Sequence, residues 1–327
     1  MKFLIAGTGS IGQRHLKNLR ALGHEVLVWD ADPVQLEAAR TLGGMVVASL
    51  DVGLKRAPDG LLVCTPPASH LAIATQAMLA DVHVFVEKPL AVESAGVDEL
   101  ILLARKRSRV MLVGCNLRFF RSLRRVKALV EAERIGRVLS ARADCGFYLP
   151  SWRPGRDYRQ TYSARARDGG GILLDAIHEF DYLRWLLGEV TEVFCIAGRW
   201  SRLEIDVEDL AEVSLRFASG ALAQLHLDYL RRSYTRSCEL IGETGVIHWD
   251  YLTRRVEVYA GEPDRWEGYR EPIDDNHSEM FVEEMRHFIR CIDGQDAPLV
   301  DGTDALASLK LVEAAKASAT RRAWVTL

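Results

Sequence analysis

The segment Phe3-Leu4-Ile5-Ala6-Gly7-Thr8-Gly9-Ser10-Ile11-Gly12 decides the fold of this 327-residue chain. Four apolar residues precede a G-x-G-x-x-G turn, and Gln13 continues into a helical pattern, so the segment predicts a buried strand, a tight turn and a helix. In such a turn the first glycine permits the sharp bend, the second lets a phosphate approach the backbone, and the third lets the helix pack on the strand. The helix N-terminus favours anions, which predicts a pyrophosphate site.

An acidic residue at the end of the next apolar run supports this interpretation. Val26–Trp29 is followed by Asp30, near the spacing expected for the acid that binds a ribose 2′-OH. A carboxylate repels a 2′-phosphate, so NAD is favoured over NADP. The alternative is a structural glycine turn in another α/β fold. The predicted cofactor contacts are Gly7, Thr8, Gly9, Ser10, Ile11, Gly12 and Asp30.

Composition excludes several classes of protein. The net charge of −3 and the hydrophobic fraction of 48% fit a soluble globular chain with no nucleic-acid surface. No apolar stretch approaches the roughly 20 residues of a membrane span, and the first strand begins too early for a signal peptide. The cysteines are scattered without a C-x-x-C pair, which predicts reduced thiols, no metal site and a cytoplasmic location.

Strand-like and helix-like segments alternate through residue 118. This alternation predicts an α/β domain over 1–118, a Rossmann-type doubly wound parallel sheet that binds NAD. Ligands of such sheets lie at the carboxyl ends of the strands. Three polar or irregular segments fall there: Thr65–His70, Glu87–Pro89 and Asn116–Arg118.

Lys88 is the most informative of these strand-end residues. It directly precedes Pro89, so its backbone is restrained toward extended geometry. A lysine fixed there can reach a substrate oxygen beside the nicotinamide. Position alone equally allows a surface lysine at a strand end.

Four motifs together resemble one family. The glycine turn at 7–12, T-P-P-x-x-H at 65–70, E-K-P-L at 87–90 and G-C-N-L-R-F at 114–119 are similar to the glucose–fructose oxidoreductase / inositol dehydrogenase / MocA (Gfo/Idh/MocA) family, in its order and spacing. The resemblance implies that Lys88 is catalytic or orients the substrate, and that the Lys88–Pro89 bond is cis. It also implies cofactor contacts from the strand-end segments: Cys64, Thr65, Pro66, His70, Glu87 and Lys88.

A loop rich in aromatic and cationic residues begins the second domain, predicted over 119–327. Leu149–Arg159 contains Trp152, Arg153 and Tyr158, which can stack on a sugar or bind its anionic groups. The alternative is that Trp152 and Tyr158 only pin the loop to the core. With Lys88, Asn116 and Arg118, these three residues are candidate substrate contacts.

The segment from Ile172 to Gly188 predicts one helix with a polar stripe. Asp175, His178, Glu179 and Tyr182 fall on one face. An imidazole can take a hydroxyl proton near neutral pH, and a neighbouring carboxylate can orient it. Asp175 and His178 are therefore candidate catalytic and substrate-binding residues; a buried structural histidine is the alternative, and metal binding lacks a clear third ligand.

One spacing departs from the resembled family, in which the aspartate and histidine of this motif stand four residues apart. Here His178 follows Asp175 by three residues, which turns the imidazole to the other side of the helix. The main proton carrier is therefore open between His178 and Lys88. The surrounding pattern resembles a branch of the family linked to surface-polysaccharide sugars, which we take as a hint about substrate.

Strand-like runs without helices between them fill most of the remainder. They predict a large, mostly antiparallel open sheet in an α+β domain. The segment 169–187 would cover part of one face, and a second subunit would cover the other, giving a homodimer or homotetramer. Pro263–Asp275 is expected to be a mobile loop. Helices near 277–292 and 304–320 close the chain, and the last is expected to pack back on the first domain.

The sequence thus predicts an NAD-dependent oxidoreductase acting on a secondary hydroxyl of a sugar, nucleotide sugar or cyclitol. The substrate would lie between Lys88, Asn116, the Trp152 loop and the Asp175 helix, with His178 as the base. A second interpretation is a redox-neutral enzyme that retains its NAD, such as a hydride-shuttling glycosidase. A third is a non-enzymatic NAD or sugar sensor.

Overall fold

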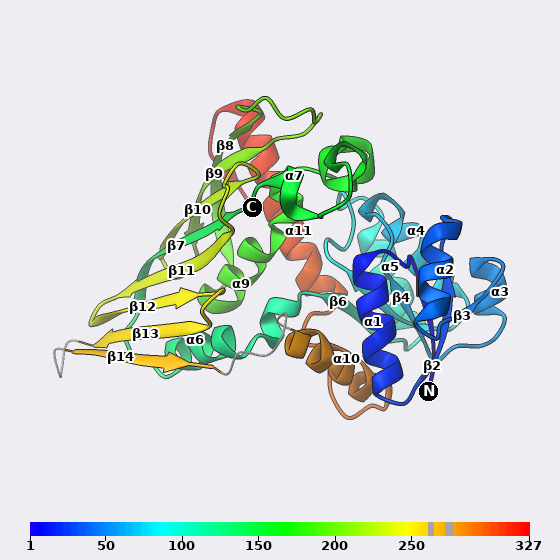
Figure 1. The fold of residues 1–327 in the computed structure, drawn as a ribbon. Helices are drawn as coiled ribbons and strands as arrows, with labels where there is room; N and C mark the ends of the chain where they lie inside the picture. Colours follow the sequence, from blue (N-terminus) through cyan, green and yellow to red (C-terminus); the bar gives the residue numbers. More distant parts are fainter. Residues whose placement is uncertain (261–264, 272–277) are drawn as a thin grey trace. The chain divides into compact units, whose positions relative to one another are not determined.

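The computed structural model describes residues 1–260, 265–271 and 278–327. Within these residues the chain divides into two compact units (Figure 1). The first contains residues 1–116 and 278–309, and the second contains 117–277 and 310–327. The helix α11, Gly302–Arg321, continues from one unit into the other.

The first unit is built on a six-stranded parallel sheet, which confirms the predicted fold class. The strand order is β3-β2-β1-β4-β5-β6, as in a dinucleotide-binding fold. The strands are β1 Lys2–Ala6, β2 Glu25–Trp29, β3 Met45–Val46, β4 Gly60–Val63, β5 His83–Glu87 and β6 Met111–Gly114. The α-helices are α1 Ser10–Ala21, α2 Pro33–Thr41, α3 Leu50–Leu54, α4 His70–Leu79, α5 Val97–Lys106 and α10 Ser278–Ile292.

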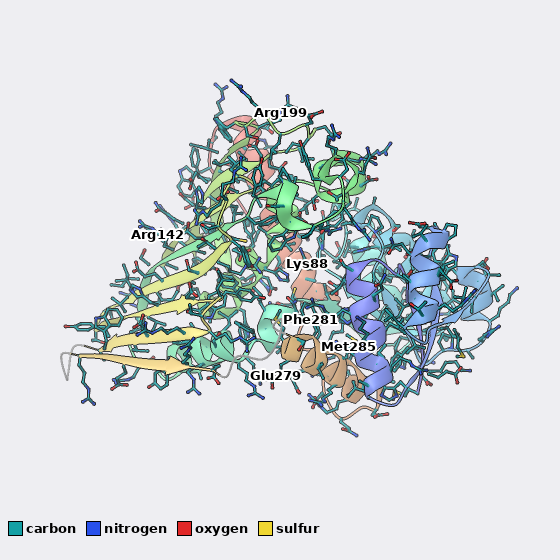
Figure 2. The ribbon with its side chains drawn as sticks, in the orientation of Figure 1. Lys88, Arg142, Arg199, Glu279, Phe281 and Met285 are labelled. Atoms are coloured by element: carbon teal, nitrogen blue, oxygen red, sulfur yellow. The ribbon has the colours of Figure 1, made fainter. Side chains whose placement is uncertain are left out.

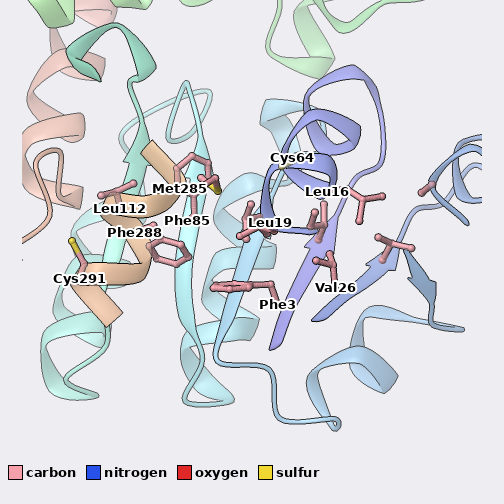
Figure 3. Close-up of a cluster of buried hydrophobic side chains, with 14 residues drawn as sticks. Phe3, Leu16, Leu19, Val26, Cys64, Phe85, Leu112, Met285, Phe288 and Cys291 are labelled. Atoms are coloured by element: carbon pink, nitrogen blue, oxygen red, sulfur yellow. The ribbon is translucent and has the colours of Figure 1, made fainter. Parts of the chain in front are cut away.

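A late segment of the chain completes the core of this unit. Helix α10 places Met285, Phe288 and Cys291 against Phe85 and Leu112 of the sheet (Figure 3). Helix α1 contributes Leu16 and Leu19 to the same cluster. Because these side chains are almost fully buried, the sheet, α1 and α10 form one hydrophobic core.

The second unit holds a nine-stranded sheet among the described residues, in the order β14-β13-β12-β11-β7-β10-β9-β8-β15. Its pairings are antiparallel except between β7 and β10, as predicted for a mostly antiparallel sheet. The strands are β7 Val138–Gly146, β8 Val190–Gly198, β9 Leu210–Phe217, β10 Leu222–Asp228, β11 Thr235–Gly242, β12 Gly245–Asp250, β13 Arg255–Ala260, β14 Arg265–Arg270 and β15 Val325–Thr326. The α-helices are α6 Arg121–Glu131, α7 Leu149–Trp152, α8 Ile172–Asp175 and α9 Ile177–Leu187.

Helices of the second unit cover one face of its sheet. Figure 1 shows α6 and α9 on that face. The opposite face carries outward side chains such as Arg142 (Figure 2), and no helix of the described part of the unit lies over it. Association through this face remains an expectation from the sequence.

The prediction of a mobile loop over Pro263–Asp275 is wrong where the structure describes that segment. Residues 265–270 form β14, which pairs along its length with β13, and the ring of Trp266 lies 5.6 Å from that of Tyr259, centroid to centroid. The remaining residues of the predicted loop, apart from Glu271, lie outside the described residues.

Two predictions from composition concern the cysteines and membrane spans. All six cysteines are free and buried, so none forms a disulfide. Within residues 1–260, 265–271 and 278–327, no helix combines the length and apolar character needed to cross a membrane.

Candidate active site

The glycine turn has the geometry that its spacing predicted. Gly7 has φ +93°, and a Cβ there would lie 2.6 Å from the backbone of Cys64 and Thr65. A Cβ on Gly12 would lie 1.9 Å from the carbonyl oxygen of Gly7. A Cβ on Gly9 would meet nothing within 4 Å, so the second glycine borders open space. The turn is therefore closed toward the protein and open where a pyrophosphate would approach.

Helix α1 begins directly after this turn. Its first turn contains no acidic side chain, and Gly9 offers no side-chain cap. The first N–H groups of a helix have no partner within it, so they and the helix dipole favour an anion here. Ser10 and Ile11 are the first two residues of α1 and carry two of these N–H groups.

Asp30 is tied to the glycine turn. Its Oδ2 accepts from the backbone N–H of Thr8 at 2.5 Å and from the Thr8 hydroxyl at 3.1 Å. Its Oδ1 accepts from the N–H of Asp32 at 2.9 Å. The carboxylate is thus fixed at the end of β2, where the ribose-binding acid of a dinucleotide fold stands.

The segment Cys64–His70 follows β4, and its last residue, His70, contacts two backbone carbonyls. The His70 ring is 1% exposed, with Nδ1 2.8 Å from the carbonyl of Pro89 and Nε2 2.8 Å from the carbonyl of Thr65. Burial lowers the pKa of His70, although both carbonyl contacts oppose that shift. A neutral ring carries one N–H and donates to one carbonyl at a time. His70 therefore joins two predicted cofactor segments through their backbones.

The other three predicted contacts of this segment, Cys64, Thr65 and Pro66, differ in accessibility. Cys64 is 7% exposed, and burial raises the pKa of its thiol well above the usual value, so it is a neutral core group. Pro66 is exposed, and Thr65 Oγ1 accepts a hydrogen bond from Ser69 at 2.6 Å. Of the four predicted contacts in the segment, Thr65 and Pro66 are therefore the two that present atoms at the surface of the unit.

Lys88 leaves the end of β5 and is supported by its neighbour. Glu87 Oε1 lies 2.7 Å from Nε2 of His15, and Glu87 Oε2 accepts from the Lys88 N–H at 3.3 Å. The Lys88–Pro89 peptide bond is cis, as the family resemblance implied. Figure 2 marks Lys88 in the first unit.

The predicted single helix from Ile172 is wrong at Ala176. This residue has φ −95° and ψ 26°, which ends α8 at Asp175 and starts α9 at Ile177. Asp175 therefore does not share a helical face with His178, Glu179 and Tyr182, which all lie on α9.

The two tyrosines that hold Asp175 were missed by the sequence analysis. The Tyr162 hydroxyl donates to Oδ1 at 2.7 Å, and the Tyr229 hydroxyl donates to Oδ2 at 2.6 Å. Burial, reinforced by the Asp175 charge, raises the pKa of both phenols, so both remain donors at neutral pH. Hydrogen bonds to a carboxylate are stronger than neutral ones, so the pair fixes Asp175 in place.

Glu208 was also missed, and it supports the helix that carries Asp175. Its Oε1 accepts from the Leu173 N–H at 3.2 Å, at the start of α8. Gly171 leaves room for this carboxylate, because a Cβ there would lie only 2.4 Å from Glu208 Oε1. The φ of Gly171, +105°, also favours glycine. Part of the Gly169–Gly171 run is thus explained by a packed carboxylate.

The other members of the predicted stripe face the interior of the unit. Glu179 is 0% exposed and pairs with Arg236, its Oε1 2.8 Å from Nε. Tyr182 is also 0% exposed and packs edge-on against Trp249 at 5.6 Å. His178 is 6% exposed on the first turn of α9. The stripe therefore supplies a buried ion pair and an aromatic contact in addition to the predicted catalytic pair.

In the aromatic loop Leu149–Arg159, an exposed tryptophan packs against a buried aromatic ring. Trp152 is 42% exposed and lies 4.2 Å from Phe147, ring centroid to centroid. Arg153 lies over the ring of Tyr162 at 5.1 Å, beside the Asp175 contact. The Tyr158 hydroxyl accepts from the Glu204 N–H at 3.2 Å, which gives that tyrosine a loop-anchoring contact. These contacts agree with the alternative that Trp152 and Tyr158 pin the loop, and binding of a sugar by the loop stays a prediction.

Arg118 and Asn116 differ in their surroundings. Arg118 is 3% exposed, and its guanidinium donates to both oxygens of Asp181, at 2.9 and 2.8 Å. This bidentate pair occupies the arginine within its own unit, and we do not propose a substrate contact for it. Asn116 is half-buried at the end of the first unit, after β6.

Two sequence profiles match this chain. The profile of the oxidoreductase family with an NAD-binding Rossmann fold matches residues 1–115. The profile of the GFO/IDH/MocA C-terminal domain matches residues 123–248. Both halves of the resemblance drawn from the motifs are thus confirmed.

Proteins similar over the full length include two dehydrogenases. The chain is 32% identical to the myo-inositol 2-dehydrogenase of Thermotoga maritima, covering 100% of this chain and 98% of that protein. It is 27% identical to an inositol 2-dehydrogenase of Rhizobium meliloti, covering 100% and 99%. The crystal structure of GenD2 from gentamicin A biosynthesis in complex with NAD is similar with a TM-score of 0.87 and 26% identity, covering 100% of this chain and 96% of that one.

Proposed function

The chain belongs to the Gfo/Idh/MocA family of NAD-binding oxidoreductases, and we propose that it transfers a hydride between NAD and a secondary hydroxyl or keto group of a sugar, nucleotide sugar or cyclitol. Enzymes of this family act on CH–OH groups with NAD, and so does this chain. The observation that carries the proposal is the Asp175 carboxylate, held by two phenols three residues before His178. The similarity to two inositol 2-dehydrogenases supports a polyhydroxylated substrate.

The residues of the first unit fit NAD. Gly9 borders open space at the start of α1, and Asp30 is fixed beside the same turn. The glycine turn and the first N–H groups of α1 would hold the pyrophosphate, and Asp30 would accept from the ribose hydroxyls. Thr65 and Pro66 would lie along the cofactor. When bound, NAD supplies the acceptor for a hydride.

In this proposal His178 removes the proton of the substrate hydroxyl. A neutral imidazole is suited to that task near neutral pH. Asp175, three residues earlier in the chain, would supply the ionised carboxylate that stabilises the imidazolium that forms. The two tyrosines keep Asp175 in one orientation during this step.

Lys88 stabilises the oxygen from which the proton departs. Its ammonium can donate to an oxygen that gains negative charge, and such preorganised donors make large contributions to catalysis. The anchored backbone of Lys88 limits where the ammonium can lie. Exposed Trp152, with Arg153, Tyr158 and Asn116, would then select the polyhydroxylated substrate.

Binding and turnover together test the proposal. The purified chain would be titrated with NADH and NADPH by fluorescence, then supplied with NAD and a panel of inositols, hexoses, uronic acids and UDP-sugars. We expect tighter binding of NADH and NADH formation with at least one panel member. NAD that stays bound through purification, with sugars converted but no NADH released, would instead support the redox-neutral enzyme. Folded protein that binds neither nucleotide would contradict the proposal at its first step.

A further inference from the structure

A buried cluster of titratable side chains lies behind the end of β5 in the first unit. His15 of α1, Glu87 of β5 and Glu284 of α10 each place one nitrogen or oxygen so that these atoms lie within 4.8 Å of one another. His15 and Glu284 are 0% exposed, and the side chain of Glu87 is 12% exposed. The three come from distant parts of the chain, and the catalytic proposal above does not use His15 or Glu284.

Two of the three groups are already paired. Glu87 Oε1 lies 2.7 Å from His15 Nε2, and Glu87 Oε2 accepts from the Lys88 N–H at 3.3 Å. Gly114, opposite Glu87 on β6, leaves space for this carboxylate, since a Cβ there would lie 3.1 Å from Oε2. Glu87 is therefore a fixed support for the backbone of Lys88.

Glu284 is the unusual member. Within the part of the chain that the structure describes, neither of its oxygens has a hydrogen-bond partner. Around it the described residues place the titratable groups His15 from α1, Glu87 from β5 and Cys64 after β4, and none of these is a lysine or arginine. If both carboxylates were charged, one imidazolium could offset only one of the two negative charges, which is costly in a buried site.

One proton on Glu284 removes that excess charge. The carboxyl group then carries an O–H that can be directed toward the Glu87 carboxylate. Burial and the Glu87 charge both raise the pKa of Glu284 well above its usual value, in agreement with this assignment. The apolar face of α10 around it holds Phe281, whose ring lies 6.1 Å from that of His15, and Met285 (Figure 2).

We propose that Glu284 is held as a neutral carboxylic acid and acts as a positioning residue, fixing Glu87 and through it the backbone of Lys88. The effect on Lys88 rests on the function proposed above, whereas the protonation state of Glu284 does not. The cluster also joins three elements of the first unit: α1, which begins the cofactor site, β5, which ends at Lys88, and α10.

Two substitutions test whether Glu284 acts as a neutral carboxylic acid or as a charged carboxylate. Glu284→Gln keeps the shape and the neutral polarity of a carboxylic acid, while Glu284→Ala removes both. Glu283→Gln is the matched control, because Glu283 pairs with Arg286 at the surface of the same helix. We expect Glu284→Gln to keep kcat and KM within about threefold of wild type. We expect Glu284→Ala to lower kcat at least about tenfold, with NADH affinity retained.

The protonation state has readouts that do not depend on turnover. The infrared carbonyl band of a protonated carboxyl should be present in wild type and the Glu283→Gln control and absent in Glu284→Gln. Because a raised pKa gives stability that is present below the usual pKa of about 4.3 and lost as pH rises, the Tm of Glu284→Gln relative to wild type should increase with pH.

Opposite results would overturn the proposal. They are a missing infrared band in wild type, a Tm difference that does not change with pH, or a Glu284→Gln variant as impaired as Glu284→Ala. A divalent metal bound in equal amount to the wild-type protein and lost in Glu284→Gln would instead make the cluster a metal site. If the protein converts no sugar, the infrared and Tm results still decide the protonation state, so failure of the two proposals is distinguishable.

Discussion

The hydroxyl of Tyr229 donates a hydrogen bond of 2.6 Å to Oδ2 of Asp175. Tyr229 follows strand β10 and is 0% exposed, while Asp175 ends the short helix α8. Since Tyr162 donates to the other oxygen, the orientation of the carboxylate is set by residues distant in the sequence. The catalytic aspartate proposed here is therefore a preorganised acceptor.

Tyr229→Phe tests this preorganisation. The variant removes one hydrogen bond to a charged group, worth about 1.5–3 kcal/mol, so kcat should fall about 10- to 100-fold. NADH affinity, measured by fluorescence titration, should be unchanged, because Tyr229 belongs to the second unit. Tyr269→Phe is the control. The Tyr269 hydroxyl also donates to a carboxylate, that of Glu267, and both residues belong to β14. Equal activity in both variants would remove Tyr229 from the mechanism.

Lys88→Met tests the role of the anchored lysine. Methionine keeps much of the length of the side chain but has no charge, so kcat/KM should fall about 10²- to 10³-fold through lost stabilisation of the oxygen. Lys17→Met, at an exposed position of α1, should behave as wild type. Steady-state kinetics of the two variants give the comparison. A Lys88→Met enzyme with normal kcat/KM would make Lys88 a surface lysine.

Two glycines of the turn should respond in opposite ways to alanine. Gly9 has φ −64° and open space around its added Cβ, so Gly9→Ala should keep its Tm but bind NADH at least about tenfold more weakly. Gly12→Ala forces a Cβ to 1.9 Å from the Gly7 carbonyl oxygen and should destabilise the fold by about 1–3 kcal/mol. The Tm of each variant and its affinity for NADH, measured by titration, check both expectations. Weak binding without instability in Gly12→Ala would refute the packing argument.

Asp30→Asn tests cofactor choice. The amide can still accept from the Thr8 N–H, so the turn should stay intact, while the charge that repels a 2′-phosphate is lost. We expect the preference for NADH over NADPH to fall at least about tenfold in paired titrations. Asp32→Asn, at the N-cap of α2, is the control for a nearby loss of charge. An unchanged preference would mean that another residue selects the cofactor.

His226 predicts a pH-dependent contribution to stability. Its ring lies 3.0 Å from Asp228 and 2.6 Å from Glu212, and these carboxylates raise the pKa of His226 to about 9. A raised pKa gives stability that is complete below the usual pKa of about 6.5 and lost as pH rises through the folded value. The Tm deficit of His226→Gln should therefore shrink between about pH 6.5 and pH 9.

His248→Gln is the control for that series, because His248 pairs with Glu239 on the same sheet. A deficit of His226→Gln that stays constant over the whole pH range would contradict the prediction.

Local signals in the sequence predicted the first unit well. The glycine turn, the acid after β2 and the lysine before a proline each depend on neighbours within a few residues, and the structure places all three at strand ends. Contacts over long sequence separations were not predictable in this way. Tyr229 lies 54 residues from Asp175, and Glu208 lies 35 residues from Leu173.

Two errors have the same physical origin. Helical periodicity continues through Ala176, but the helix ends there, next to Asp175, whose carboxylate is held by Tyr162 and Tyr229. Residues 265–270 contain charged residues and a glycine, which are typical of a loop, yet pairing with β13 makes them a strand. Local preference was overruled by packing in both cases.

NADH formation by wild type and His178→Asn tests the central claim most directly. Both proteins would receive NAD and the same panel of inositols, hexoses, uronic acids and UDP-sugars, after NADH titration has shown equal affinity. We predict that at least one compound yields NADH with the wild type, and that His178→Asn lowers this rate about 10²- to 10⁴-fold. NADH formation at the same rate in both proteins would contradict His178 as the base, and no NADH from any compound with NAD bound would contradict the proposed reaction.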